Sequence, residues 1–176
     1  MNLKLNELKT FETERLVLTP TTTADAEFIL ALFNTPKWIE FIGDRNLQNV
    51  QDAEEYISNK ITPQIQKVGF GNYTVTRKFD RAKIGSCGLY DREGVEGIDI
   101  GFAFLPQYEK KGYGFESANK LKELAFSEFN LTEINGITSE KNIGSQKLLM
   151  KLGLQFQKNI KLTDDTEEVL LYKLAF

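Results

Sequence analysis

Several short stretches of the chain alternate between apolar and polar residues or are continuously apolar, and both patterns favour β-strands. The first lies at residues 15–18, where Leu16 and Leu18 alternate with Arg15 and Val17 ahead of Pro20. A turn at 79–81 joins the two strands of a predicted hairpin, and a turn at 91–94 separates this hairpin from the next strand. We expect the last two strands to pair antiparallel. Besides the first, the predicted strands span residues 73–78, 83–90, 97–105, 133–138, 154–162 and 168–176.

Other stretches repeat their apolar residues every three or four positions, which is the spacing of one face of a helix. The predicted helices span residues 25–33, 49–65, 113–129 and 142–152, with a short helical turn at 38–42. The resulting order of elements, β α α β β β α β α β β, lacks the regular alternation of a doubly wound fold. It predicts an α+β domain, a mixed sheet with helices packed on it.

Length and charge exclude several classes of protein. The 176 residues fit one domain, 1–176, and 41% apolar with 27% charged residues is an ordinary globular balance. A net charge of −3 argues against a nucleic-acid-binding surface, which needs an excess of Lys and Arg. No apolar run reaches the roughly 20 residues of a membrane span. Lys4, Glu7 and Lys9 interrupt any leader, so we expect a soluble cytoplasmic protein.

The chain contains no histidine, and this narrows its possible chemistry. Mechanisms of the Ser-His-Asp and Cys-His types are excluded, as are His-ligated metal sites. The single cysteine, Cys87, can form neither an intramolecular disulfide nor a CxxC metal site, and we expect it to be a small buried residue. No metal site is predicted.

The segment from Phe104 to Glu116 carries the clearest candidate site. A strand ends at Pro106, a short loop follows, and the glycines at 112 and 114 open a helix. Glycines let the backbone turn tightly and approach a ligand, and free N–H groups at a helix N-terminus bind anions. Lys110 and Lys111 add positive charge. A simple turn with two solvated lysines is the competing interpretation. The spacing fits neither a Walker A loop nor a dinucleotide fingerprint.

Separated segments, in the right order, resemble the GNAT superfamily of acetyl-CoA-dependent N-acetyltransferases. The sequence Glu-Lys-Lys-Gly-Tyr-Gly at 109–114 is similar to its Gln/Arg-x-x-Gly-x-Gly/Ala signature, with Glu109 as a departure. Residues 142–145, 148–149 and 153–154 resemble its downstream N-x-x-S…K-x-G-[FL] segment. Residues 14–18 and 99–106 resemble the branch that contains the ribosomal-protein alanine N-acetyltransferases.

This resemblance implies a GNAT fold, a mixed and mostly antiparallel sheet with helices on both faces, and acetyl-CoA as cosubstrate. Main-chain groups of Phe104 and Leu105 would bond the pantetheine. Asn142 and Ser145 would lie near the pantetheine and the sulfur. Glu109 would weaken binding if it pointed at the pyrophosphate, so we expect it to point to solvent. The N–H groups expected to hold the pyrophosphate belong to Lys110, Lys111, Gly112, Tyr113, Gly114 and Phe115.

Acetyl transfer to an amine needs no covalent enzyme intermediate, so the missing histidine does not argue against it. Leu149 stands where the superfamily usually has a tyrosine acid, and Ser145 matches the serine of the ribosomal-protein branch. Asn142 and Ser145 are also good residues for capping a helix. Asp99 is the candidate base, although a hydrogen-bonded strand residue is an equal alternative. Ile160 loosely aligns with a glutamate base of that branch, which is then absent here.

The sequence therefore predicts an N-acetyltransferase that acts on a primary amine, of a protein N-terminus or of a small molecule, by direct attack in a ternary complex. An acyl-CoA-binding module without efficient turnover is the alternative, and a nucleotide-phosphate-binding domain fits the spacing less well. We expect a monomer or a homodimer, with neither nucleic-acid nor membrane partners. An aromatic set would line the acceptor cleft or pack in the core: Trp38, Phe41, Tyr56, Phe70 and Tyr73.

Overall fold

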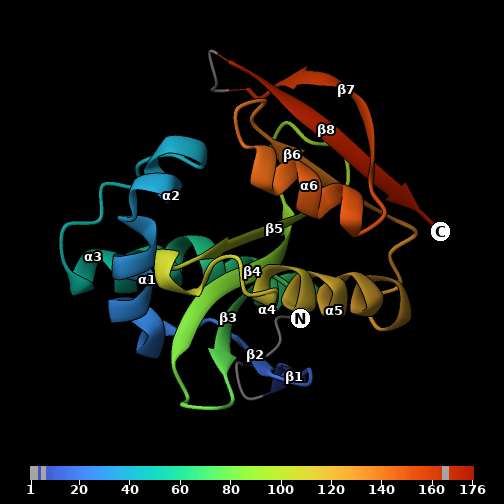
Figure 1. Ribbon diagram of the computed structural model, residues 1–176. Helices are drawn as coiled ribbons and strands as arrows, with labels where there is room; N and C mark the ends of the chain where they lie inside the picture. The colour runs from blue at the N-terminus through green and yellow to red at the C-terminus, as the bar shows by residue number, and fades with distance from the viewer. Residues whose placement is uncertain (1–3, 5–6, 164–166) are drawn as a thin grey trace.

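A single sheet of eight strands runs through the computed structural model, which describes residues 4, 7–163 and 167–176 (Figure 1). The order in space is β1-β2-β3-β4-β5-β6-β8-β7, and among the described strands only β5 and β6 pair in parallel. This confirms the predicted mixed, mostly antiparallel sheet and the closing antiparallel pair. The strands are β1 (Phe11–Glu12), β2 (Leu16–Pro20), β3 (Asn72–Arg77), β4 (Lys83–Asp91), β5 (Ile98–Phe104), β6 (Glu133–Thr138), β7 (Gln155–Lys161) and β8 (Glu168–Ala175).

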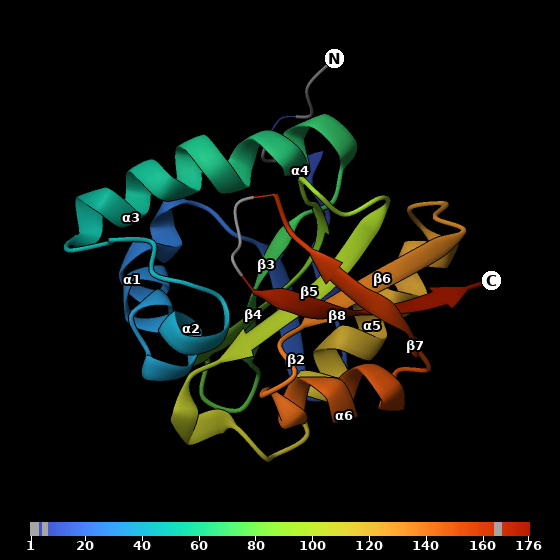
Figure 2. The same cartoon turned by 90° about the horizontal axis from the view of Figure 1, so that it is seen from above.

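Helices cover both faces of the sheet (Figure 2). One face carries α5 (Tyr113–Ser127) and α6 (Ile143–Lys151), and the other carries α1 (Ala26–Phe33), α2 (Pro36–Phe41) and α3 (Val50–Tyr56). The side chains of β5 alternate between the two faces, as a strand requires. Its even-numbered apolar residues join the core under α5, whereas Ala103 packs against the smaller cluster of α1 and α3.

The predicted helix 49–65 is a longer rod that contains a π-helical turn. Helix α3 passes through this turn (Ile57–Ile61) into α4 (Thr62–Val68), and Gly69 ends the rod with φ of 85°. Pro63 explains the wide turn, because proline lacks an N–H and its ring clashes with the carbonyl four residues earlier in a regular helix. The other predicted boundaries lie within two residues of the observed ones, and α2 begins at Pro36 where the sequence predicted Trp38.

Strands β5 and β6 meet briefly and then separate. Their ladder has one aligned pair, Asp99 with Asn135. Beyond it β5 continues beside β4, while β6 continues beside β8. The separation leaves one side of β5 without a partner strand in the middle of the sheet, where unpaired main-chain groups are normally avoided.

Gly136 of β6 lies under the buried side chain of Leu149. A Cβ at Gly136 would overlap one methyl carbon of Leu149 and lie 3.0 Å from the other. Because overpacking a dense core costs about 1–3 kcal/mol, Gly136→Ala should lower the urea midpoint of unfolding.

The matched control is Gly144→Ala in α6. Apart from the backbone of the helix itself, the nearest atom to a Cβ there would be the Asn142 side-chain oxygen, at 3.9 Å. This change should leave the free energy of unfolding unchanged or raise it by about 0.4–1 kcal/mol. A Gly136→Ala variant as stable as the wild type would contradict the packing described here.

Candidate functional site

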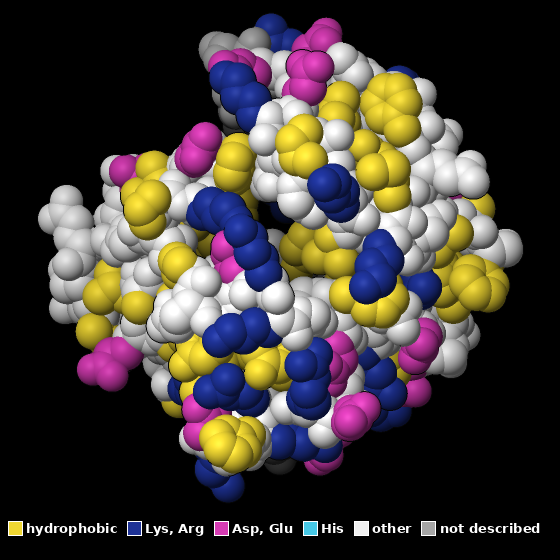
Figure 3. Space-filling view, in the orientation of Figure 1, with side chains coloured by type: hydrophobic (Ala, Val, Ile, Leu, Met, Phe, Trp, Pro, Cys, Tyr) yellow, Lys and Arg dark blue, Asp and Glu magenta, His cyan; other side chains and the backbone are white. Residues whose placement is uncertain are grey.

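A cavity of about 850 Å³ opens where β5 and β6 separate, and Figure 3 shows it as a hollow in the middle of this face. One end lies between β5, the loop after it and the start of α6. The other end lies between the sheet and the helices α2 to α4. Six of the predicted site residues line it: Asp99, Phe104, Lys110, Gly114, Asn142 and Ser145. Leu105, Lys111, Gly112, Tyr113 and Phe115 are not among its lining residues.

The main chain of β5 corrects the prediction for Leu105. The N–H of Leu105 donates to the carbonyl of Ile84, 3.0 Å away, and the carbonyl of Leu105 accepts the N–H of Tyr108 at 2.9 Å. Successive residues of a strand direct their main-chain groups to opposite sides. The main-chain groups of Phe102 and Phe104 therefore point toward the separation from β6, whereas those of Leu105 do not.

The loop after β5 turns through two left-handed residues before α5 begins. Lys110 has φ of 59° and Gly112 has φ of 84°, which favours glycine at position 112. The first hydrogen bond of α5 runs from the N–H of Glu116 to the carbonyl of Gly112. The N–H groups of residues 113–115 thus have no acceptor within the helix. This end of a 15-residue helix is suited to bind an anion.

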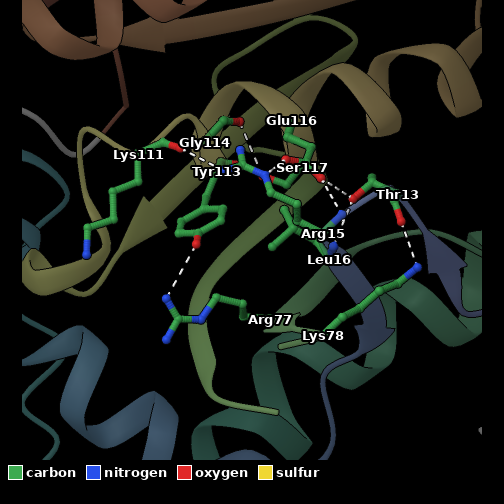
Figure 4. Close-up of polar contacts among 10 residues, drawn as sticks. All are labelled: Thr13, Arg15, Leu16, Arg77, Lys78, Lys111, Tyr113, Gly114, Glu116 and Ser117. Atoms are coloured by element: carbon green, nitrogen blue, oxygen red, sulfur yellow. Dashed lines mark hydrogen bonds and ion pairs between the residues drawn. The ribbon is translucent and has the colours of Figure 1, made fainter. Parts of the chain in front are cut away.

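Arg15 and Glu116 hold this loop from the side of β2 (Figure 4). The Arg15 guanidinium donates through Nη1 to the carbonyl of Lys111 at 3.1 Å and through Nε to Glu116 at 2.6 Å. It also lies 4.4 Å from the ring centre of Tyr113. The other carboxylate oxygen of Glu116 accepts from the Thr13 hydroxyl and from the Arg15 N–H. Partial burial alone would raise the pKa of Glu116, but these hydrogen bonds outweigh it and lower the pKa.

The side chains of two predicted loop residues, Tyr113 and Phe115, contact other side chains of the protein. Tyr113 is buried, and its hydroxyl accepts from Arg77 at 3.4 Å. The ring of Phe115 lies 4.2 Å from the ammonium of Lys151. The prediction for positions 113 and 115 rests on the main-chain N–H groups alone, and these remain available.

Glu109 pairs with a lysine of α2 across one end of the cavity. Its Oε2 lies 2.8 Å from Nζ of Lys37, and a quarter of the Glu109 side chain is exposed. The sequence-based expectation that Glu109 points to solvent is therefore only partly right. Because Lys37 balances its charge, Glu109 does not present an isolated negative charge to the loop.

The start of α6 places a serine hydroxyl at the cavity. The Asn142 side chain accepts the N–H of Ser145 at 3.1 Å, so Asn142 is the N-cap of the helix. Ser145 is half-buried and lines the cavity. One helical turn later, Leu149 is 1% exposed and packs in the core. Gly153 follows the helix with φ of 98°, as expected of a glycine stop.

A network of polar side chains lies on the sheet surface at the other end of the cavity. The ring of Tyr90 lies across two glycines, because a Cβ at Gly88 or Gly101 would come within 2.5 Å or 2.8 Å of it. Its hydroxyl donates to Asn72 at 2.5 Å, and the hydroxyl of Ser86 donates to the same oxygen at 2.7 Å. Burial raises the pKa of Tyr90, so the phenol stays protonated.

Asp99 lies behind an arginine. Its two oxygens accept from Nε and Nη2 of Arg92 at 3.1 Å and 3.3 Å. The Asp99 side chain is 1% exposed and that of Arg92 is 34% exposed. Burial raises the pKa of Asp99, and the charge of Arg92 opposes this rise. An acceptor amine would reach this carboxylate only after displacing Arg92, which speaks against the predicted role of Asp99 as a base.

The aromatic set divides between the cavity and the core. Trp38, Phe41 and Tyr56 line the cavity, whereas Phe70 and Tyr73 belong to the main core. Trp38 stacks on Phe33 with ring centres 3.8 Å apart. Cys87 is completely buried, as predicted, and burial raises the pKa of its thiol to about 12.

Sequence reasoning missed three residues at the Asp99 end of the cavity: Ser86, Tyr90 and Arg92. Ser86 and Tyr90 alternate with the core residues Cys87 and Leu89 along β4, so the period of two could have placed them on the face of Asp99. Arg92 lies in a turn, where no periodic signal exists.

Within residues 4, 7–163 and 167–176, which the structure describes, every helix is too short or too polar to span a membrane. The same residues contain no group of three or more Cys, Asp or Glu side chains arranged to hold a metal ion.

Known proteins resemble this chain over most of its length. An uncharacterized N-acetyltransferase of Bacillus subtilis (strain 168), YoaA, is 27% identical over 145 residues, which are 82% of this chain and 81% of that protein. The ribosomal-protein-S5-alanine acetyltransferase of Vibrio fischeri is 18% identical, with a TM-score of 0.77 over 95% of this chain and 96% of that one.

A third similar structure is the microcin C7 self-immunity acetyltransferase MccE, solved in complex with acetyl-CoA and AMP. It is 15% identical, with a TM-score of 0.77 over 93% of this chain and 94% of that one. At such identities these two structures support the fold alone. Residues 15–155 match the family described as "Acetyltransferase (GNAT) domain". The chain therefore belongs to the GNAT family of acetyltransferases.

Proposed function

We propose that this protein binds acetyl-CoA where β5 and β6 separate and transfers the acetyl group to a primary amine, of a small molecule or of a protein N-terminus. One observation carries the proposal. The unpaired side of β5 and Gly114, in the first turn of α5, border the same cavity, and Ser145 lies in its wall. The similarity to ribosomal-protein acetyltransferases agrees with this function but does not identify the acceptor.

The residues present fit acetyl-CoA. An extended chain with amide groups, such as pantetheine, can bond to the main chain of Phe102 and Phe104 as a strand would. The N–H groups of residues 113–115 and the Lys110 side chain suit a pyrophosphate. Gly114 lacks a side chain where Phe104 and Leu148 converge, since a Cβ there would contact both. Glu109 does not oppose binding, because Lys37 pairs with it.

Acetyl-CoA supplies an acetyl thioester, which a neutral amine can attack directly. The Ser145 hydroxyl in the cavity wall then donates a hydrogen bond to the leaving sulfur and relays a proton to it from water, so that the serine itself stays protonated. Asn142 fixes the first turn of α6 and thereby the position of Ser145. With Asp99 covered by Arg92, the amine loses its proton to water.

A second candidate function, acyl-CoA binding without efficient turnover, is favoured by Leu149. This residue occupies the position of the expected tyrosine acid, and its side chain is buried in the core. Ile160, loosely aligned with an absent base, lies on β7 opposite Val169 and does not line the cavity.

Acetyl-CoA at one hundred times its dissociation constant should stabilise the protein by about 2.7 kcal/mol. For a chain of this size, the melting temperature should rise by roughly 5–10 °C. A thermal-shift experiment with acetyl-CoA, CoA and ATP tests this expectation. Stabilisation by ATP but not by acetyl-CoA would contradict the proposal.

Replacing Ser145 separates the two candidate functions. Ser145→Ala should lower kcat by about tenfold or more and leave the dissociation constant of acetyl-CoA nearly unchanged. Release of CoA thiol with a panel of amines measures turnover, and Ser127→Ala on the far part of α5 is the control. Unchanged kcat would remove Ser145 from the mechanism, whereas acetyl-CoA binding without turnover in the wild type would favour the second function.

The Arg15–Glu116 pair should determine affinity for acetyl-CoA. Arg15→Gln removes the donor to Lys111, and Arg15→Lys keeps the charge but loses the planar fork. Both should raise the dissociation constant by about tenfold, the effect of a lost charged hydrogen bond, measured by calorimetry. Arg81→Gln, an equal charge change in the exposed β3–β4 turn, should have little effect. Equal losses in Arg15→Gln and Arg81→Gln would show that only net charge matters.

A further inference from the structure

The end of the cavity away from Ser145 presents a guanidinium. Arg92 follows β4, and Asp99 stands on the neighbouring strand β5. The ion pair joins Nε and Nη2 of Arg92 to the two Asp99 oxygens, and it is the arginine that retains exposed surface. A molecule in this end of the cavity therefore meets Arg92 before it meets Asp99.

The geometry of the guanidinium leaves a second binding edge. A guanidinium is planar and carries five N–H donors, so two of its edges can each hold a carboxylate with two parallel hydrogen bonds. Asp99 takes the edge of Nε and Nη2 and fixes the plane of the group. In the part of the chain that the structure describes, Nη1 of Arg92 has no hydrogen-bond partner.

The groups around Arg92 combine apolar surface with balanced charge. The Arg92 carbon Cζ lies 5.9 Å from the ring centre of Tyr90, and Trp38, Phe41 and Tyr56 add further aromatic wall. Two more cations, Arg45 and Lys60, line this end, as do the exposed carboxylates of Asp91 and Glu93. This environment suits a small molecule that carries one positive group, one negative group and an apolar side chain.

We propose that Arg92 binds the carboxylate of the acceptor, and that the acceptor is a free amino acid with an apolar or aromatic side chain. This inference rests on the proposed function and narrows its substrate. In a peptide N-terminus the neighbouring carboxyl is an uncharged amide, which gives a guanidinium no ionic partner. Asp99 is then a positioning residue that acts through Arg92, and not the catalytic base.

Matched amines test the carboxylate. Phenylalanine, phenylalaninamide and phenethylamine share a benzyl group and an amine, and only the first has a carboxylate. The wild type should acetylate phenylalanine with a kcat/KM at least tenfold above those of the other two. Arg92→Gln should remove this preference, mainly through KM, and leave phenethylamine within about twofold. Arg81→Gln serves as the control for charge. An equal wild-type kcat/KM for all three amines would overturn the inference while the proposed function stands.

Asp99→Asn distinguishes positioning from base catalysis. A positioning role predicts a higher KM for phenylalanine, little change with phenethylamine, and an unchanged pH profile of kcat. A base would instead be needed for both amines, so kcat would fall with both, and the acid limb of the profile would change. That second result would overturn the role assigned to Asp99.

Product binding keeps the test independent of turnover. N-acetylphenylalanine should bind to the wild type, and Arg92→Gln should weaken it at least tenfold by calorimetry. N-acetylphenethylamine should bind equally to both proteins. Absence of carboxylate-dependent binding would overturn the inference, and so would tighter binding of O-phosphoethanolamine than of phenylalanine. Failure of acetyl-CoA to bind would instead contradict the proposed function, because Arg92 lies outside the coenzyme site.

Discussion

The separation of β5 from β6 is the feature on which the rest of the site depends. A sheet normally pairs the main-chain groups of its inner strands, yet these two strands share only the pair Asp99–Asn135. Each still has a full partner on its other side, β4 or β8, so the sheet stays continuous while its middle opens. The opening exposes the main chain of Phe102 and Phe104 and gives the cavity its volume. The same divergence places α6 beside the start of α5.

The loop before α5 illustrates how a main-chain site is held in shape by side chains outside it. An anion site made of N–H groups depends on the path of the backbone, because the donors cannot rotate as side chains do. Two left-handed residues set that path, and Arg15 bonds the carbonyl between them. Arg15 is itself held by Glu116, from the first turn of the same helix. The loop, the helix and β2 therefore form one connected unit.

The sequence predicted the elements well because their signals are local. The apolar spacing of α5 and the alternation of β4 depend on residues a few positions apart, and the glycines at 112 and 114 mark the start of a helix directly. The site was predicted less completely, because its contacts join distant residues. The contact between Arg15 and Glu116 spans 101 positions, and no pattern in a single sequence reports it. For Leu105, only the register of β4 with β5 decides which way the main chain points.

Asp99 illustrates why residue type and position do not settle a chemical role. A carboxylate on a strand that borders a cavity has the chemistry of a base, and burial raises its pKa, which would favour that role. Arg92 lies in a turn seven residues earlier and donates hydrogen bonds to both oxygens of Asp99. The charge of Asp99 therefore holds the guanidinium in place. Asp99, the buried partner, loses access to the cavity, and its hydrogen bonds fix the orientation of the more exposed Arg92. The group with exposed surface in the cavity is thus cationic, although the residue that the sequence suggested is anionic.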